Sequence, residues 1–133
     1  MATNSAIVEL SEAIFNRIKE AHKRVYLDSA PEKDPATGKA VRFPYVCYRL
    51  PSSTQRELPE EFFLEVDCWD NRADAIRLEN LAAAVDCKLH GWNYISDQFG
   101  LRVFRVNRLN VRDPDPKIRR RLLRYLVRVY FIT

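Results

Sequence analysis

The chain has 133 residues, 47% hydrophobic and 30% charged, which is typical of one soluble globular domain and excludes wholesale disorder. Its net charge is only +4, and an excess of that size does not by itself imply nucleic-acid binding. No apolar run approaches the ~18 residues that cross a bilayer, and no signal-peptide pattern opens the sequence. We therefore expect a single cytoplasmic domain spanning 1–133, with no membrane contact.

The N-terminal segment predicts an amphipathic helix from Ser5 to about Lys23. Apolar residues recur there at helical spacing, and Asn4 or Ser5 can accept hydrogen bonds from the amides of the first turn. The short segment 25–27 then leads into residues 28–42, where prolines and a glycine break regular structure. This second stretch predicts a mobile loop.

Two strands are expected next, at about Tyr45 to Leu50 and at Glu61 to Trp69, with a second long loop between them at 51–60. The later strand alternates strictly. One of its faces is apolar and carries Phe62, Leu64, Val66 and Cys68. The opposite face is aromatic and acidic and carries Phe63, Glu65, Asp67 and Trp69. Such a face indicates either an interface or a surface that a loop covers.

A second helix is predicted from about Asp74 to Leu89, with Asp70 and Asn71 as its capping residues and Gly91 as its stop. Two long strands follow at 101–111 and 119–132. The last segment could also be read as a helix, because its arginines recur at four-residue spacing. Its many β-branched and aromatic residues favour a strand.

The expected order is therefore helix, strand, strand, helix, strand, strand. This order predicts an α+β fold with a mainly antiparallel four-stranded sheet and flanking helices. Neither repeats nor low-complexity tracts interrupt the sequence.

Catalytic chemistry finds little support in the sequence. The carboxylates between Glu61 and Asp74 could suggest Mg²⁺-dependent phosphodiester cleavage, but no lysine stands two residues beyond Glu65 or Asp67. No glycine-rich phosphate loop occurs, and neither histidine lies in a nucleophile elbow. We therefore expect no enzyme, no cofactor and no metal site. The cysteines, Cys47, Cys68 and Cys87, are expected to be buried free thiols in a reducing compartment.

The arginines of the last third are the sharpest remaining signal, and three interpretations stay open. They could contact a phosphate backbone, which would make the hairpin a DNA-binding module. They could be a solvated face that prevents edge aggregation. They could also pair with the acidic face around Glu65 and Asp67 on a neighbouring copy, which we prefer because it uses both charge features. The arginines in question are Arg102, Arg105, Arg108, Arg112, Arg119, Arg120, Arg121, Arg124 and Arg128.

A family resemblance emerges from the order and spacing of several short motifs. These are Tyr26, Ala30-Pro31, Phe43-Pro44-Tyr45-Val46, Val66-Asp67-Cys68-Trp69 and the helix from Leu78 to Leu89. Together they resemble the tail-completion or tail-terminator proteins of long-tailed bacteriophages, over most of the chain. The chain departs from the family in the insertion from Lys33 to Arg42 and in its strongly basic C-terminal hairpin.

The resemblance implies a structural virion protein, assembled in the host cytoplasm, that sits at the junction of tail and neck. It implies a homohexameric ring that closes the head-proximal end of the tail tube and meets the head-completion or connector protein, with DNA passing through its lumen. A ring needs two complementary faces. We expect the subunit interface at Phe63, Glu65, Asp67, Trp69, Arg120, Arg124 and Arg128. We expect the loops to dock tube or connector through Lys33, Asp34, Lys39, Arg42, Gln55, Arg56 and Glu57.

Overall fold

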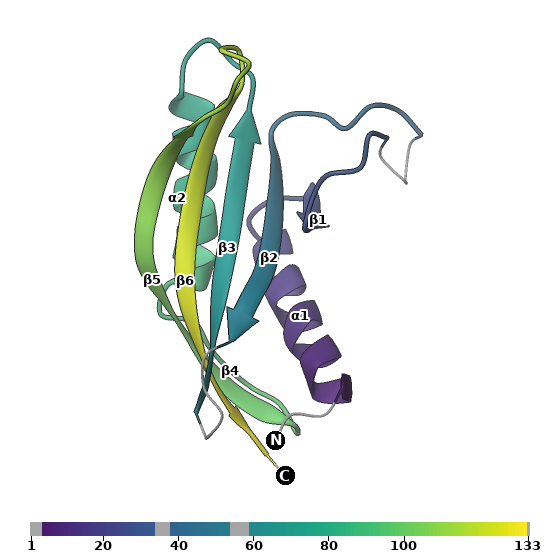
Figure 1. The fold of residues 1–133 in the computed structure, drawn as a ribbon, viewed down its shortest axis with the longest axis vertical. Helices are drawn as coiled ribbons and strands as arrows, with labels where there is room; N and C mark the ends of the chain where they lie inside the picture. Colours follow the sequence, from purple (N-terminus) through teal and green to yellow (C-terminus); the bar gives the residue numbers. More distant parts are fainter. Residues whose placement is uncertain (1–3, 34–37, 54–58, 133) are drawn as a thin grey trace.

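The computed structural model describes residues 4–33, 38–53 and 59–132. Two helices and six strands follow one another along the chain (Figure 1). In order they are α1 (Asn4–Lys19), β1 (Val25–Leu27), β2 (Tyr45–Ser53), β3 (Glu60–Asp70), α2 (Ile76–Leu89), β4 (Asn93–Ile95), β5 (Phe99–Arg112) and β6 (Arg119–Phe131).

The sheet corrects the expected fold class. It is a curled, mixed sheet of six strands in the order β1-β2-β3-β6-β5-β4, and β1 runs parallel to β2 while every other neighbouring pair is antiparallel. The prediction of a four-stranded, mainly antiparallel sheet was therefore wrong. The two additional strands, β1 and β4, have three residues each. Segments of that length are too short to show a two-residue alternation in the sequence.

The last segment of the sequence is a strand, as its composition predicted. β6 pairs with β3 from Arg119 to Val129 and with β5 along its whole length. Its side chains at 123, 125, 127, 129 and 131 are all buried. Because both edges of β6 are paired, this strand lies in the middle of the sheet.

Both helices cover the same face of the sheet, where most of the buried hydrophobic side chains form one cluster. Leu10, Ile14 and Ile18 of α1 have no exposed area, and neither has Leu78 of α2. The helices also touch each other, since Arg17 Nε donates to the backbone oxygen of Lys88 at 2.7 Å. No helix among the described residues lies on the opposite face of the sheet, and we call this the open face.

The ends of the helices differ from expectation. α1 stops at Lys19, and the chain turns before β1. α2 begins at Ile76, whose amide donates to Asp74 Oδ1 at 3.0 Å, so Asp70 and Asn71 do not cap it. The predicted stop is correct, because Gly91 has a φ of +77°, which a residue with a side chain rarely adopts.

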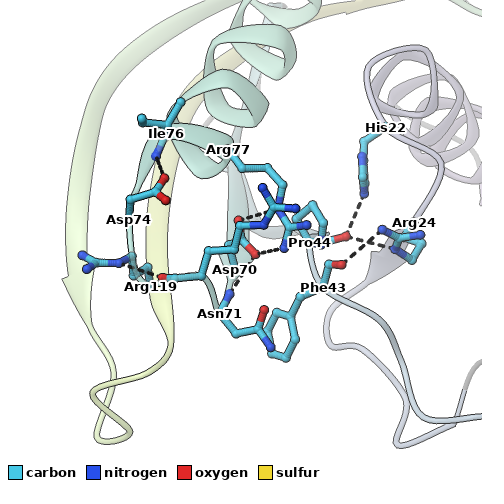
Figure 2. A network of polar contacts seen from close by, with 11 residues as sticks. His22, Arg24, Phe43, Pro44, Asp70, Asn71, Asp74, Ile76, Arg77 and Arg119 are labelled. Carbon is cyan, nitrogen blue, oxygen red and sulfur yellow. Dashed lines mark hydrogen bonds and ion pairs between the residues drawn. The ribbon is translucent and has the colours of Figure 1, made fainter.

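Asp70 instead anchors a polar network below the start of α2 (Figure 2). Its side chain is fully buried and accepts from Arg77 Nε at 2.9 Å and from the same guanidinium's Nη2. Burial tends to raise the pKa of this carboxyl, but the hydrogen bonds from Arg77 and the Asn71 amide outweigh it and leave the pKa below its usual value. The pair fixes the end of β3 against α2.

The same network holds the base of an arm formed by the long connection between β1 and β2 (Figures 1 and 2). His22 Nε2 lies 2.8 Å from the backbone oxygen of Pro44, and Arg24 donates to the backbone oxygens of Pro44 and Phe43 at 3.0 and 3.3 Å. Within the described part of the arm, Lys33 forms an antiparallel bridge with Ala40. The arm therefore leaves the body of the protein from a well-anchored base.

Candidate interaction surface

The open face is made of alternate residues from five strands, which the register arranges in cross-strand rows. Two rows are dominated by charged side chains, and the other four are mainly apolar or aromatic. The charged rows are Glu61–Arg128–Arg102–Asn93 and Arg49–Glu65–Arg124–Asn107. The remaining rows are Phe63–Leu126–Phe104, Cys47–Asp67–Leu122–Leu109, Tyr45–Trp69–Arg120–Val111 and Tyr130–Gly100–Ile95.

The carboxylates of this face pair with arginines of the same chain. Glu65 lies between Arg49 and Arg124, whose Nε atoms are 2.8 and 3.1 Å from its two oxygens. Burial tends to raise the pKa of Glu65, but these two arginines outweigh it and lower the pKa. In the neighbouring charged row, Arg128 contacts Glu61 at 3.2 Å. The carboxylates of this face are therefore compensated within the chain.

One corner of the open face, beside the base of the arm, is more deeply enclosed. Asp67 is 2% exposed and accepts from Arg120 Nη2 at 2.6 Å. The Arg120 guanidinium lies 4.0 Å from the centre of the Trp69 ring, which stacks on Tyr45 at 5.8 Å. Together with the arm residues 28–30, these side chains line a pocket of about 310 Å³. The arm therefore partly covers the aromatic face. Coverage by a loop was one of the two interpretations of this face drawn from the sequence.

All seven residues predicted to form a subunit interface lie on the open face, but the structure changes how they relate to one another. The acidic and basic sets were expected to compensate each other between copies. They sit on adjacent strands of one chain, where Glu61, Glu65 and Trp69 are the register partners of Arg128, Arg124 and Arg120. A neighbouring copy is therefore not needed to neutralise them. The sequence alone could not reveal this pairing within one chain, because the pairing depends on β6 lying beside β3.

The other arginines of the hairpin do not all lie on the same side of it. An extra residue in β5 between Arg105 and Asn107 shifts the register against β6. Arg105 then contacts Asp86 of α2 at 3.0 Å, while Arg108 and Arg121 both contact Glu79 of α2. Those three arginines face the helices, whereas Arg102, Arg120, Arg124 and Arg128 face away from them. Within the described ranges, the side chain of Arg112 has no hydrogen-bond or ion-pair partner.

Two shallow hollows on the open face have largely apolar walls. One, of about 350 Å³, lies at the shifted register beside Phe63, Val106 and Arg124. The other, of about 440 Å³, lies between Ile95 and Tyr130 over Gly100, with Arg102 at its rim. Ile95 is 83% exposed, the highest value of any large hydrophobic side chain that the structure describes. Sequence reasoning missed this hollow, because its walls come from strands 35 residues apart.

The predicted docking loops are only partly described. Lys33, Lys39 and Arg42 are exposed and lie on the arm. Asp34, Gln55, Arg56 and Glu57 lie outside the described residues.

The cysteines and carboxylates show no sign of metal chemistry in the described ranges. No group of three or more potential metal ligands occurs there. Cys47 and Cys68 are buried, whereas Cys87 is exposed on α2, which corrects the expectation that every thiol would be buried. Among the same residues, neither helix is long and apolar enough to cross a membrane.

Comparison with known proteins identifies a fold but not a family. No family model matches the sequence, and no curated protein matches it. Among solved structures, the fold is similar to that of a chain in the virion of a native gene transfer agent (GTA) particle. The TM-score is 0.66 at 18% sequence identity, and the similarity covers 90% of this chain and 93% of that chain. The likeness therefore extends over nearly the whole domain.

Proposed function

We propose that this chain is a structural virion protein, and more specifically a tail-terminator-like protein of a long-tailed phage or related particle. In this role several copies form a ring, taken as a hexamer, on the head-proximal end of the tail tube. The ring would join the tube to the head-completion or connector protein at the tail-neck junction, after assembly in the host cytoplasm. DNA would pass through its lumen.

The observation that carries the proposal is the similarity of fold to a virion chain over nine tenths of both chains. The motif order that resembles tail terminators points to the same class independently of the fold. The charged groups also fit a structural role. The carboxylates Glu61, Glu65 and Asp67 of the open face are held by arginines instead of being left available for chemistry.

The arrangement of charge favours this proposal over a DNA-binding module. Seven of the hairpin arginines contact a carboxylate or side-chain oxygen of the same chain, and Arg119 donates to backbone oxygens of Arg72 and Ala73. A phosphate backbone would have to compete with these contacts. The hairpin is therefore a poor source of free positive charge.

Electron microscopy of the purified protein mixed with tail tubes tests the proposal. The expected result is a ring at one end of each tube, and tubes incubated with an unrelated basic protein of similar size are the control. Failure to bind tube ends, combined with a monomeric state at every concentration, would contradict the proposal. Tight, steeply salt-dependent binding to duplex DNA without ring formation would favour the DNA-binding alternative.

A further inference from the structure

We propose that the hollow over Gly100 on the open face receives helix α1 of the neighbouring copy, with Val8 as the inserted side chain and Glu12 against Arg102. This inference rests on the proposed ring and names the contact that would build it.

The hollow is built to accept a side chain. In the register of β4, β5 and β6, Gly100 lies directly between Ile95 and Tyr130. A Cβ added at Gly100 would be in ordinary contact with Ile95 Cγ1 at 3.9 Å, so the floor between the two apolar walls is low but not crowded. Ile95 and Tyr130 are 83% and 48% exposed. Large exposed hydrophobic side chains grouped around a hollow are typical of a protein interface.

The rim of the hollow is positively charged. Arg102 follows Gly100 on the same face of β5, and its guanidinium stacks on Phe104 and donates to Asn93 Oδ1 at 3.0 Å. No carboxylate within the described ranges pairs with it. The open face as a whole carries five arginines and three carboxylates, which gives it a local charge of +2. Its partner should therefore be apolar and acidic.

The outer surface of α1 has this character. Val8 is 56% exposed and Glu12 is exposed one helical turn later. Basic residues do not occur in α1 until Arg17, so its first half is acidic. Glu12 has no ion pair in the described part of the chain. An exposed apolar residue next to an uncompensated carboxylate matches the hollow next to Arg102.

The spacing of the two pairs also agrees. Val8 and Glu12 are separated by four residues of helix, or about 6 Å at 1.5 Å per residue. Gly100 and Arg102 are separated by two residues of strand, or about 7 Å. One helix laid along β5 can therefore place Val8 over Gly100 and Glu12 beside Arg102 at the same time.

The position of the two surfaces suits a closed ring. The start of α1 and the β4–β5 turn lie toward the same end of the molecule (Figure 1), and the side chain of Gln98 contacts Glu9. The hollow and the outer side of α1 face away from each other across the sheet. A contact between two different surfaces is heterologous, and it closes into a ring when the rotation from each copy to the next completes a full turn.

A charge exchange tests the contact. Arg102→Glu and Glu12→Arg should each weaken self-association roughly tenfold or more, because each places like charges together. The double variant restores opposite charges and should recover most of the loss. Sedimentation of the full chain over a range of protein concentrations, alone and with tail tubes, measures the effect. The matched control is Arg112→Glu, which lies at the far end of β5 and outside the contact and should change little.

Disulfide trapping gives an independent measurement. Val8→Cys in one preparation and Ile95→Cys in another, both in a Cys87→Ala background, should cross-link only when mixed. Recovery in the double variant together with mixed cross-linking supports the contact. A wild-type ring without recovery or cross-linking would overturn this contact and leave the proposed function standing. A protein that neither self-associates nor binds tube ends would overturn both.

Discussion

The two faces of the sheet are made from alternate residues of the same strands, yet they are stabilised in different ways. On the covered face, β3 and β6 present aliphatic and aromatic side chains that the two helices bury. On the open face, the same strands present carboxylates and arginines that pair across the strands. The comparison shows that an uncovered face can be kept ordered by local pairing, while the free energy of folding comes mainly from the covered one.

The largest expected effect separates the two faces directly. Leu64→Ala removes a fully buried side chain from the covered face and should lower the free energy of unfolding by about 4 kcal/mol. Leu126→Ala, on the partly exposed open face, is the matched control and should cost less than half as much. Urea denaturation measures both. Equal losses would show that the open face is as deeply packed as the covered one.

The Asp70–Arg77 pair should give the next largest effect. Arg77→Met leaves a buried carboxylate without its partner and should cost about 3 kcal/mol at neutral pH. The pKa of Asp70 is lowered in the folded protein, so the pair stabilises above the unfolded carboxyl's pKa of about 4. That contribution is lost as the pH falls through the folded pKa.

The difference between wild type and Arg77→Met should therefore shrink in acid. Thermal unfolding measured from pH 7 down to pH 3 checks this, with Arg112→Met as the control for loss of an arginine. A difference that stays constant over the whole range would contradict the assigned role of Asp70.

A smaller effect is expected from the open-face ion pairs. Glu65→Gln keeps the shape of the side chain but removes the charge between Arg49 and Arg124, and should cost about 1 kcal/mol. Because the folded pKa of Glu65 is lowered, this contribution is also present above pH ~4 and lost below it. Added salt should reduce the difference from wild type. Glu32→Gln, at an exposed position on the arm, is the control, and a larger loss of stability there would argue against local pairing as the source of the stabilisation.

Chemical labelling of the thiols tests the same comparison without any substitution and with the smallest expected effect on stability. Burial raises the pKa of Cys47 to about 11 and also raises that of Cys68, so both should resist a thiol-specific reagent until the protein unfolds. Cys87 is exposed and should react at once. Counting modified thiols by mass spectrometry gives one in the native state and three in denaturant. A second fast thiol would show that the open face around Cys47 opens readily.

Local periodicity explains which parts of the fold could be predicted. The apolar stripe of α1 and the alternation in β3 and β6 are visible because burial on one side imposes a period of about 3.6 or 2 residues. β1 and β4 are too short to carry such a period. Their pairing depends on contacts with distant strands, so the number of strands and the parallel pair could not be found.

The candidate surface shows the same limit. The sequence predicted that Glu65 and Arg124 lie on outward faces, but it could not show that their strands are neighbours. Because β3 and β6 are adjacent, the contact that was expected between copies is formed within one chain. The shift near Arg105 moves arginines between faces and leaves no trace in the spacing. The hollow over Gly100 joins residues from three strands, and no local pattern brings them together.

The central position of β6 has a consequence for biosynthesis. This strand is the last of the six along the described part of the chain, yet it is inserted between β3 and β5, which do not pair with each other. Until residue 131 has left the ribosome, a nascent chain exposes two unpaired strand edges and part of an apolar core. Folding of this domain therefore cannot be completed before β6 has emerged, and a polypeptide released a few residues before Arg119 would be a substrate for chaperones and proteases.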